Sequence, residues 1–300
     1  MGRPYEIAIL SGKGGTGKTS ITAAFAAFAS NTVFVDCDVD AADLHLIFSP
    51  ENYHHETFPS GAKAVIDPEK CKNCGLCRKL CRFNAIEEIK DAFVIDEFTC
   101  EGCGLCSEAC PEGAITIEEY EKNHIYFSES RFGPMVYGKL GIAEENSGKL
   151  VSQVRIYAKN IALKNDSNYI LIDGPPGIGC PVISSVTGTD AIIAITEPTL
   201  SGWHDLLRLI EMTNRFHSRI FVVLNKYDLN EEMAAKIEKE LKKIKIPLLG
   251  KIPYNETMID SLLEGKSITE YKPDCDISVE IKNIWEIIMS KFTEAKKDKA

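Results

Sequence analysis

No hydrophobic run in this sequence is long enough to cross a membrane. A spanning helix needs about 20 consecutive apolar residues, and none of the apolar stretches in the 300 residues approaches that length. The chain does not open with a charged segment followed by an apolar one, as a secretion signal would. We therefore expect a soluble, cytoplasmic protein and no membrane contact.

An excess of basic residues is also missing. The sequence has 34 Lys and Arg against 44 Asp and Glu, a formal net charge of −10. Nucleic-acid surfaces need clustered Lys and Arg, so we expect no nucleic-acid partner and favour a positively charged protein instead. The hydrophobic content of 44% is ample for one large α/β domain or two modest domains.

The segment 6–20 predicts a strand, a phosphate-binding loop and the start of a helix. An isoleucine-rich run leads into Gly12-x-x-x-x-Gly17-Lys18-Thr19, and the alanine-rich stretch 21–29 follows. Glycines let backbone N–H groups curl around phosphate oxygens, the lysine reaches the β- and γ-phosphates, and the threonine hydroxyl binds Mg²⁺. The predicted nucleotide-binding residues of the loop are Gly12, Lys13, Gly14, Gly15, Thr16, Gly17, Lys18, Thr19 and Ser20.

A second lysine, Lys13, directly follows the first glycine of the loop. With it, the loop resembles that of the deviant Walker A family of P-loop ATPases, which includes MinD, ParA, the Mrp cluster carriers and the nitrogenase iron protein. The loop of that family is K-G-G-x-G-K-[ST], as in residues 13–19. The resemblance implies that Lys13 reaches across a nucleotide-sandwich dimer to the partner's phosphates. It also implies that Lys13 and Lys18 are catalytic and that the active unit is a homodimer.

Carboxylates follow two further predicted strands, 32–36 and 169–173. The first strand runs into the segment Asp36-Cys37-Asp38-Val39-Asp40, and the second ends in Asp173 before a Gly/Pro turn. Such residues face the crevice at the carboxyl ends of parallel strands, where these sheets bind ligands. In the family, the second Asp of the first segment orients the attacking water, which implies a catalytic role for Asp38. Thr19, Asp40 and Asp173 are the predicted magnesium ligands, although spare carboxylates at strand ends also serve as helix caps or remain solvated.

Eight of the eleven cysteines form two runs with the same spacing, which indicates metal rather than disulfides. The runs are Cys71-x₂-Cys74-x₂-Cys77-x₃-Cys81 and Cys100-x₂-Cys103-x₂-Cys106-x₃-Cys110-Pro111. They match the two halves of a bacterial-type ferredoxin, in which the fourth cysteine of each run binds the other cluster. The expected ligands are Cys71, Cys74, Cys77 and Cys110 for one [4Fe–4S] cluster and Cys81, Cys100, Cys103 and Cys106 for the other.

Zinc is the alternative for these cysteines, since C-x₂-C pairs also build zinc ribbons. One position departs from the ferredoxin pattern: Arg82 stands where a proline usually follows the fourth cysteine, and its charge near the second cluster would raise that cluster's potential. Residues 61–119 contain seven Lys and Arg against twelve Asp and Glu. This negative charge disfavours the addition of an electron, so we expect low-potential clusters.

The predicted strand 220–225 ends in Asn225-Lys226-Tyr227-Asp228. In the deviant Walker A family this asparagine contacts adenine, so the resemblance implies that Asn225 binds the nucleotide. The same pattern, N-K-x-D, also matches the guanine-reading motif of GTPases. We expect ATP because a loop containing Lys13 is typical of ATPases, with GTP as the alternative.

Residues 123–141 predict a strand and a loop that return to the main sheet. Residues 148–164 predict a crossover helix. Its basic residues could neutralise the acidic insert, namely Lys149, Arg155 and Lys159. The amphipathic helix 278–292 is expected to dock on the sheet, with membrane binding as the alternative. Cys37 and Cys180 are expected to be buried, inert thiols, with a cluster at the dimer interface as the alternative.

As a whole, the chain resembles MinD-superfamily P-loop ATPases that carry an inserted ferredoxin domain. The expected fold is α/β, a mainly parallel sheet flanked by helices, with an inserted α+β ferredoxin domain. Its expected parts are ATPase residues 1–60, the insert 61–120 and ATPase residues 121–300. The resemblance implies that a homodimer hydrolyses ATP and couples this to iron–sulfur electron transfer to a partner protein, with ATP, Mg²⁺ and two [4Fe–4S] clusters as cofactors. The alternatives are an Mrp-like iron–sulfur carrier or assembly ATPase and a redox-sensing regulatory ATPase.

Overall fold

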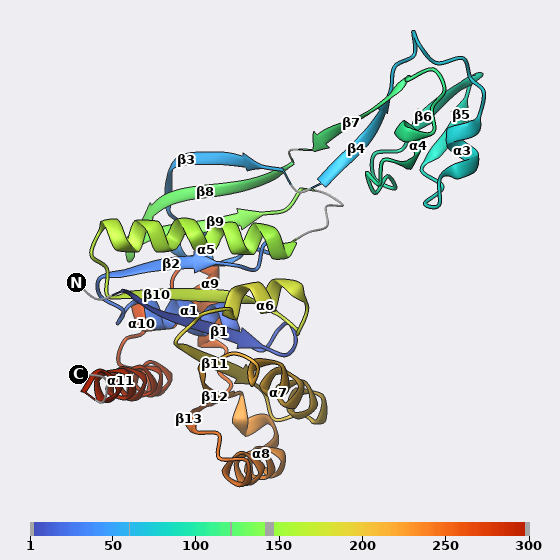
Figure 1. Ribbon diagram of the computed structural model, residues 1–300. Helices are drawn as coiled ribbons and strands as arrows, with labels where there is room; N and C mark the ends of the chain where they lie inside the picture. Colours follow the sequence, from blue (N-terminus) through green and yellow to red (C-terminus); the bar gives the residue numbers. More distant parts are fainter. Residues whose placement is uncertain (1–2, 60, 121, 142–146, 298–300) are drawn as a thin grey trace.

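The computed structural model describes residues 3–59, 61–120, 122–141 and 147–297. Figure 1 shows a central sheet with helices on both faces and a smaller part, residues 61–120, that projects from one edge. None of the helices in these ranges combines the length and the apolar character needed to traverse a lipid bilayer.

The central sheet, as far as the chain is described, has nine strands in the order β13-β12-β11-β1-β10-β2-β9-β8-β3. Neighbouring strands from β13 to β9 are parallel, whereas β8 is antiparallel to both β9 and β3. The strands are β1 (Tyr5–Ser11), β2 (Thr32–Asp36), β3 (Glu51–Phe58), β8 (Asn123–Ser130), β9 (Gly133–Lys139), β10 (Tyr169–Pro176), β11 (Ala191–Thr196), β12 (Arg219–Asn225) and β13 (Leu248–Ile252).

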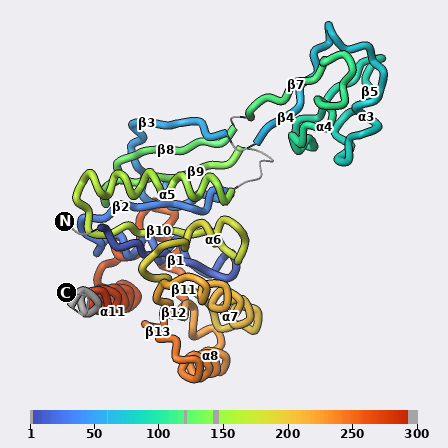
Figure 2. Tube along the Cα trace, in the orientation of Figure 1, coloured from blue at the N-terminus to red at the C-terminus, as the bar shows by residue number. Residues whose placement is uncertain are grey.

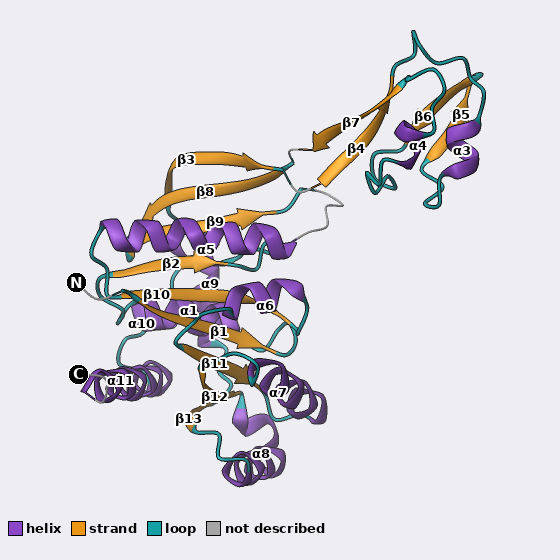
Figure 3. Ribbon diagram, viewed as in Figure 1, coloured by secondary structure: helices purple, strands orange, loops and turns teal. Residues whose placement is uncertain are grey.

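Helices cover both faces of this sheet, which explains why its parallel strands are continuous apolar runs. Alternate residues of β1 enter opposite cores: Ile7 and Ile9 enter one, and Ala8 and Leu10 enter the other. The first core is closed by α1 (Lys18–Ala26), α2 (Leu44–Phe48), α9 (Thr257–Leu263), α10 (Ile268–Tyr271) and α11 (Asp276–Lys297). The second is closed by α5 (Ser147–Lys164), α6 (Cys180–Val186), α7 (Leu200–Thr213) and α8 (Glu231–Lys243), as Figure 3 shows.

The projecting part, which we call the insert, has its own small sheets. Its elements are β4 (Gly61–Ile66), α3 (Leu76–Leu80), β5 (Ile86–Ile89), β6 (Ala92–Ile95), α4 (Leu105–Glu108) and β7 (Ile115–Tyr120). Strands β4 and β7 pair antiparallel and form the ribbon that joins the insert to the rest of the chain, while β5 and β6 form a hairpin (Figure 2). The buried hydrophobic residues described in the insert are few, namely Ala64, Ala85, Ile86, Cys100, Ala114 and Ile115.

The region predicted as one strand and a loop, residues 123–141, is instead the hairpin of β8 and β9. It pairs with a further strand, β3, that the sequence pattern did not predict. β3 is an edge strand whose side chains are mostly exposed, so it lacks the apolar signal of the buried strands. The amphipathic helix predicted at residues 278–292 lies within α11 and docks on the sheet as expected. Its apolar residues Ile281, Ile284, Ile288 and Phe292 lie in the core.

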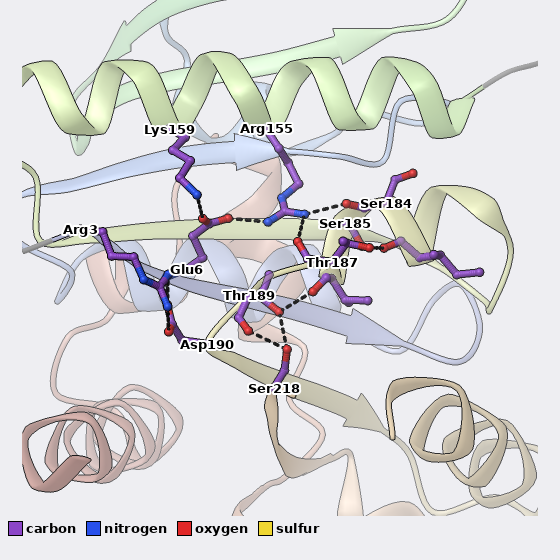
Figure 4. Close-up of polar contacts among 12 residues, drawn as sticks. Arg3, Glu6, Arg155, Lys159, Ser184, Ser185, Thr187, Thr189, Asp190 and Ser218 are labelled. Carbon is purple, nitrogen blue, oxygen red and sulfur yellow. Dashed lines mark hydrogen bonds and ion pairs between the residues drawn. The ribbon is translucent and has the colours of Figure 1, made fainter. Parts of the chain in front are cut away.

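A buried carboxylate, Glu6 on β1, binds two basic residues of α5 (Figure 4). The Glu6 side chain is 4% exposed and forms an ion pair with Arg155, and Lys159 places Nζ 3.1 Å from its Oε1. The Arg155 guanidinium also donates to the carbonyls of Ser184 and Thr187. The interpretation that Arg155 and Lys159 neutralise the acidic insert was therefore wrong. Both residues pair with Glu6 of β1, and Arg155 also binds the segment around α6.

Candidate functional site

The loop between β1 and α1 lies at the carboxyl edge of the parallel strands. Gly15 and Gly17 have φ values of +78° and +90°, which glycine adopts without strain. Gly12 packs against Asp205, whose backbone carbonyl carbon would be only 2.8 Å from an added Cβ. Seven of the nine predicted loop residues line one cavity of about 650 Å³, namely Gly14, Gly15, Thr16, Gly17, Lys18, Thr19 and Ser20. Its volume falls in the range of small-molecule sites.

Lys18, Thr19 and Asp173 form one hydrogen-bonded group beside this cavity. The Lys18 Nζ lies 3.1 Å from Asp173 Oδ1, and the Thr19 hydroxyl donates to Asp173 Oδ2 at 2.7 Å. Thr22, one turn further along α1, donates to Asp173 Oδ1 at 2.9 Å. Burial lowers the pKa of Lys18, but the surrounding carboxylates outweigh this effect and hold the pKa above its ordinary value. The lysine therefore stays charged in a carboxylate-rich interior.

The carboxylates after β2 lie in three different environments. Asp36 is fully buried and accepts N–H groups from Asp38 and Leu44, so it shapes the loop rather than facing a ligand. Burial and the carboxylate of Asp173 raise the pKa of Asp36 well above its usual range. Asp38 lies 3.8 Å from Lys18 Nζ, and burial raises its pKa to about 6. Asp40 is exposed at the rim of the cavity that Asp38 also lines.

Lys13 points away from Lys18, toward the end of β11. Its Nζ lies 2.5 Å from Glu197 Oε1 and 3.2 Å from the hydroxyl of Ser201 on α7. Lys226 also approaches Glu197, at 3.7 Å, and donates to the carbonyl of Gly15 in the loop. Glu197 was not among the predicted site residues. Glu197 directly follows a buried strand, and this position is the signal that could have indicated it.

Asn225 supports the loop from the end of β12. Its side-chain amide donates to the carbonyl of Thr16 at 2.7 Å, and Asn225 lines the cavity. Asp228, the last residue of the N-K-x-D pattern, has an oxygen that accepts the backbone N–H of Tyr254 at 2.7 Å. Asp228 is not among the described residues that line the cavity.

The far end of the cavity is made of residues that the sequence analysis missed. They follow β13, the last strand of the sheet, and include apolar and aromatic side chains, namely Pro253, Tyr254, Asn255, Met258, Ile259 and Leu262. Apolar and aromatic side chains of this kind suit the base of a nucleotide. The rule that places ligands at the carboxyl ends of parallel strands could have indicated this segment.

The eight clustered cysteines of the insert lie around two small pockets. The first cysteine site consists of Cys71, Cys74, Cys77 and Cys110, and the second cysteine site of Cys81, Cys100, Cys103 and Cys106. Each pocket is thus lined by three cysteines of one run and the fourth of the other. The fourth cysteines accept backbone N–H groups at Sγ, Cys81 from Ala85 at 3.4 Å and Cys110 from Ala114 at 3.3 Å.

Two of the remaining cysteines lie near the nucleotide cavity but in opposite environments. Cys37 follows β2 and is completely buried, and burial raises the pKa of its thiol. A buried protonated thiol is unreactive. Cys180, at the start of α6, is exposed, so the prediction that it is buried was wrong. Cys37 therefore cannot serve as a ligand at a dimer surface without a rearrangement of the core.

Comparisons with known proteins agree with this architecture. The model of the CobQ/CobB/MinD/ParA nucleotide binding domain matches residues 7–268. An uncharacterised protein of Methanocaldococcus jannaschii is 38% identical over 239 residues, which cover 77% of this chain and 81% of that protein. The septum site-determining protein MinD of Helicobacter pylori is 24% identical over 96% of this chain and 91% of its own.

Solved structures show the same fold at lower sequence identity. MinD of Pyrococcus horikoshii, complexed with Mg-ADP, superposes with a TM-score of 0.59 at 20% identity and covers 95% of this chain and 96% of its own. The cell division ATPase MinD of Pyrococcus furiosus gives 0.57 at 21% identity, over 97% and 99%. The chain has the α/β P-loop fold of MinD and belongs to the CobQ/CobB/MinD/ParA family of nucleotide-binding domains.

Proposed function

We propose that the protein is a cytoplasmic ATPase that hydrolyses Mg-ATP as a homodimer and couples hydrolysis to iron–sulfur electron transfer to a partner protein. The observation that carries the nucleotide half is the hydrogen-bonded group of Lys18, Thr19 and Asp173 beside the cavity. It offers a cation for phosphates and a hydroxyl and carboxylate for Mg²⁺. The Mg-ADP bound to the similar MinD of Pyrococcus horikoshii supports the same chemistry here.

Each polar residue of the cavity has a distinct role in this proposal. Lys18 holds the β- and γ-phosphates, and backbone N–H groups of the glycine loop surround them. Thr19 and Asp173 hold Mg²⁺, and Asp40 at the rim binds one of its waters. Bound Mg²⁺ neutralises charge on the phosphates during transfer. Asp38 orients the attacking water, and Lys13 leaves Glu197 to contact the phosphates of the partner.

ATP is favoured over GTP by the position of Asp228. In the guanine-reading motif this carboxylate must face the base, but here it accepts the N–H of Tyr254 and does not belong to the lining of the cavity. Asn225 does line the cavity and is the proposed adenine contact. The apolar surface around Met258 then packs against the base.

The iron–sulfur half is supported by the two cysteine sites. Each pocket is lined by the four thiols expected for one [4Fe–4S] cluster, and N–H groups donate to the sulfurs of the fourth cysteines. Four cysteines with the spacing x₂, x₂ and x₃, present twice, favour clusters over zinc.

Electron transfer is favoured over delivery of a cluster to an acceptor. Four thiols from two different loops enclose each pocket, which suits a permanent cluster, whereas a delivered cluster needs few ligands on an exposed surface. The insert leaves the nucleotide-binding part through β3, shortly after the loop that contains Asp38. A change in that loop on ATP binding could therefore shift the insert relative to a docked partner.

Iron analysis and electron paramagnetic resonance (EPR) of the anaerobic protein, with and without Mg-ATP, test both halves. We expect eight irons per chain and a signal from the reduced clusters that changes with Mg-ATP. In Lys18→Ala the irons should remain while the response to nucleotide is lost. Absence of iron would refute the electron-transfer half, and an iron-loaded protein indifferent to Mg-ATP would refute the coupling.

A further inference from the structure

The insert contains two copies of one motif, and this repeat relates its two cysteine sites. Position 71 is equivalent to position 100, and the same offset of 29 residues relates every ligand cysteine to its counterpart in the other run. The backbone repeats as well: the N–H of Cys71 donates to Asp67 at 3.1 Å, and that of Cys100 donates to Asp96 at 3.0 Å. Any difference in properties between the two cysteine sites must therefore come from the residues that pack around them.

The cysteine loops of the two sites pack on different parts of the structure. In the first cysteine site, the Asn73 side chain donates at 2.8 Å to the carbonyl of Asp91 in the turn between β5 and β6. At the equivalent position in the second cysteine site, Gly102 lies against the carbonyl of Ala62 on β4, which leaves no room for a Cβ. β4 belongs to the ribbon that joins the insert to the rest of the chain (Figure 2). In this pair of equivalent contacts, the second loop packs on the ribbon and the first loop packs on the hairpin of β5 and β6.

A second contact joins the same loop to the central sheet. Lys122, the residue before β8, places Nζ 3.2 Å from Glu97 Oε2 and 5.8 Å from the ring centroid of Phe98. Glu97 and Phe98 directly precede the loop that begins at Cys100. A movement of β8 would therefore be transmitted to the second cysteine site.

β8 is in turn connected to the carboxylates of the nucleotide cavity. Asp36 of β2 pairs with Tyr137 of β9, and Tyr137 pairs with Tyr126 of β8, so the three residues form one row across the sheet. The rings of Tyr137 and Tyr126 are stacked, with centroids 4.8 Å apart. Asp36 also accepts the N–H of Asp38. The row connects the loop that contains Asp38 to β8, the strand that follows Lys122.

Lys63 on β4 brings a positive charge to the second cysteine site. Its Nζ donates to the carbonyl of Cys100 at 2.8 Å, whereas the equivalent position in the other repeat is Ala92. At the first cysteine site, the charged residues Lys72 and Glu112 line the pocket and form an ion pair with each other at 2.8 Å. A nearby positive charge stabilises the reduced form of a cluster. A movement of β4 would alter this effect at one site.

We propose that the two cysteine sites are unequal. The redox potential of the second cysteine site responds to nucleotide, with Lys63 and Lys122 as positioning residues, and the first cysteine site, whose loop contacts the turn between β5 and β6, faces the redox partner. This inference rests on the proposed iron–sulfur function and adds to it an assignment of the two sites.

A potentiometric EPR titration of the anaerobic full-length chain, with and without Mg-ATP, tests the assignment. The equivalent variants Cys74→Ser and Cys103→Ser identify which reduction wave belongs to which site. We expect Mg-ATP to move only the wave that Cys103→Ser perturbs, by about tenfold in the ratio of reduced to oxidised cluster at a fixed potential, which is 59 mV for one electron. An equal shift of both waves, or a shift of the wave that Cys74→Ser perturbs, would overturn the proposal.

The role of Lys63 is tested in the same titration. Lys63→Met should remove the response of the second wave to Mg-ATP without changing ATP turnover, and Lys63→Arg should restore it. Lys90→Met, in the turn between β5 and β6, is the matched control and should respond as the unmodified chain does. Retention of the response in Lys63→Met would refute the role of Lys63.

Hydrogen exchange tests the mechanical link without relying on iron. On addition of Mg-ATP we expect the exchange rate of the Cys100 amide to change severalfold, while that of the equivalent Cys71 amide stays constant. If the chain holds no iron, the iron–sulfur function fails and the exchange measurement still decides whether the junction loop senses nucleotide. No change at Cys100, or the same change at Cys71, would contradict the link.

Discussion

Two lysines in one loop are held by different carboxylates. Lys18 is buried beside Asp173, whereas Lys13 lies against Glu197 at the end of another strand. A buried lysine among carboxylates is fixed in place, but the side chain of Lys13 is 32% exposed and could move. Replacement of Lys13 and replacement of Lys18 are therefore expected to impair different properties of the protein.

Replacement of Lys13 should affect dimerisation rather than nucleotide binding. In Lys13→Ala each protomer keeps the loop, Lys18 and the magnesium residues, so ATP should still bind with an affinity close to that of the unmodified chain. The dimer, however, loses a charge-assisted contact to the partner's phosphates. Sedimentation with Mg-ATP should show a monomer for Lys13→Ala and a dimer for the unmodified chain, and Lys18→Ala, which loses nucleotide binding itself, is the control. A dimer of Lys13→Ala with full turnover would refute the trans role.

The raised pKa of Asp38 predicts a pH dependence of ATP hydrolysis. Burial raises the pKa of this carboxyl to about 6, so it is mainly protonated at pH 5 and ionised at pH 7. The ionised form accepts a hydrogen bond from the attacking water more strongly than the protonated form and can act as a base, so kcat/KM should rise with pH through about 6. Asp38→Asn should lower kcat by about 10²-fold or more and flatten this part of the profile. A profile unchanged by Asp38→Asn would exclude this role.

Local sequence patterns indicate some site residues and miss others for a physical reason. Lys18, Thr19 and Asp173 could be placed together because each follows or begins a recognisable strand or helix at the same edge of the sheet. Glu197 and Met258 also follow strands at this edge of the sheet, so the same rule indicates their segments. No motif in those segments singles out these two residues, and a position at the edge alone does not distinguish a ligand-binding residue from its neighbours.

Among the helices and strands, those that are most buried are the easiest to predict from the sequence. The central strands, such as β10 and β11, are buried on both faces and therefore appear as apolar runs in the sequence. β3 lies at the edge of the sheet, and its residues are mostly polar and exposed, so its pattern does not distinguish it from a loop. Helices α2, α9 and α10 are only four to seven residues long and present too few turns for a periodic signal.

Loss of Arg155 should destabilise the packing of α5 on β1. The residue pairs with the buried Glu6 and satisfies two carbonyls of the segment around α6. Arg155→Ala leaves a buried carboxylate with Lys159 as its remaining partner in α5, which should cost about 3 kcal/mol in the free energy of unfolding. Urea denaturation should show this loss, while Lys149→Ala, an exposed change on the same helix, should stay within about 0.5 kcal/mol. Equal stability of the two variants would contradict a structural role for the pair.

At the scale of the whole molecule, the two parts of the chain differ in how they are stabilised. The central sheet has two extensive cores, whereas the hydrophobic residues described as buried in the insert are Ala64, Ala85, Ile86, Cys100, Ala114 and Ile115. A unit of about 60 residues with so small a core needs metal or disulfides to fold. None of its eight clustered cysteines forms a disulfide in the described structure, so the proposed iron–sulfur clusters are the expected stabiliser.

Removal of iron should therefore unfold the insert and leave the nucleotide-binding part intact. After chelation under reducing conditions, amides of β5 and β6 should lose protection from hydrogen exchange, while those of β1 and β10 keep it. Nucleotide binding should persist, because its residues lie in the central sheet. Unchanged protection of β5 and β6 after complete loss of iron would show that the insert folds by its own packing.

Excision of the insert should give a folded nucleotide-binding protein without iron. Phe58, the last residue of β3, pairs with Asn123, the first residue of β8, so the two ends of the excised segment lie side by side on antiparallel strands. An Asn-Gly turn can join such strands directly. The chain with residues 59–122 replaced by Asn-Gly should retain cooperative unfolding and ATP binding, both measurable by calorimetry, and Lys18→Ala in the same background should abolish the binding. A shortened chain that fails to fold would show that the insert is part of the core, and the separation of the two functions would then be wrong.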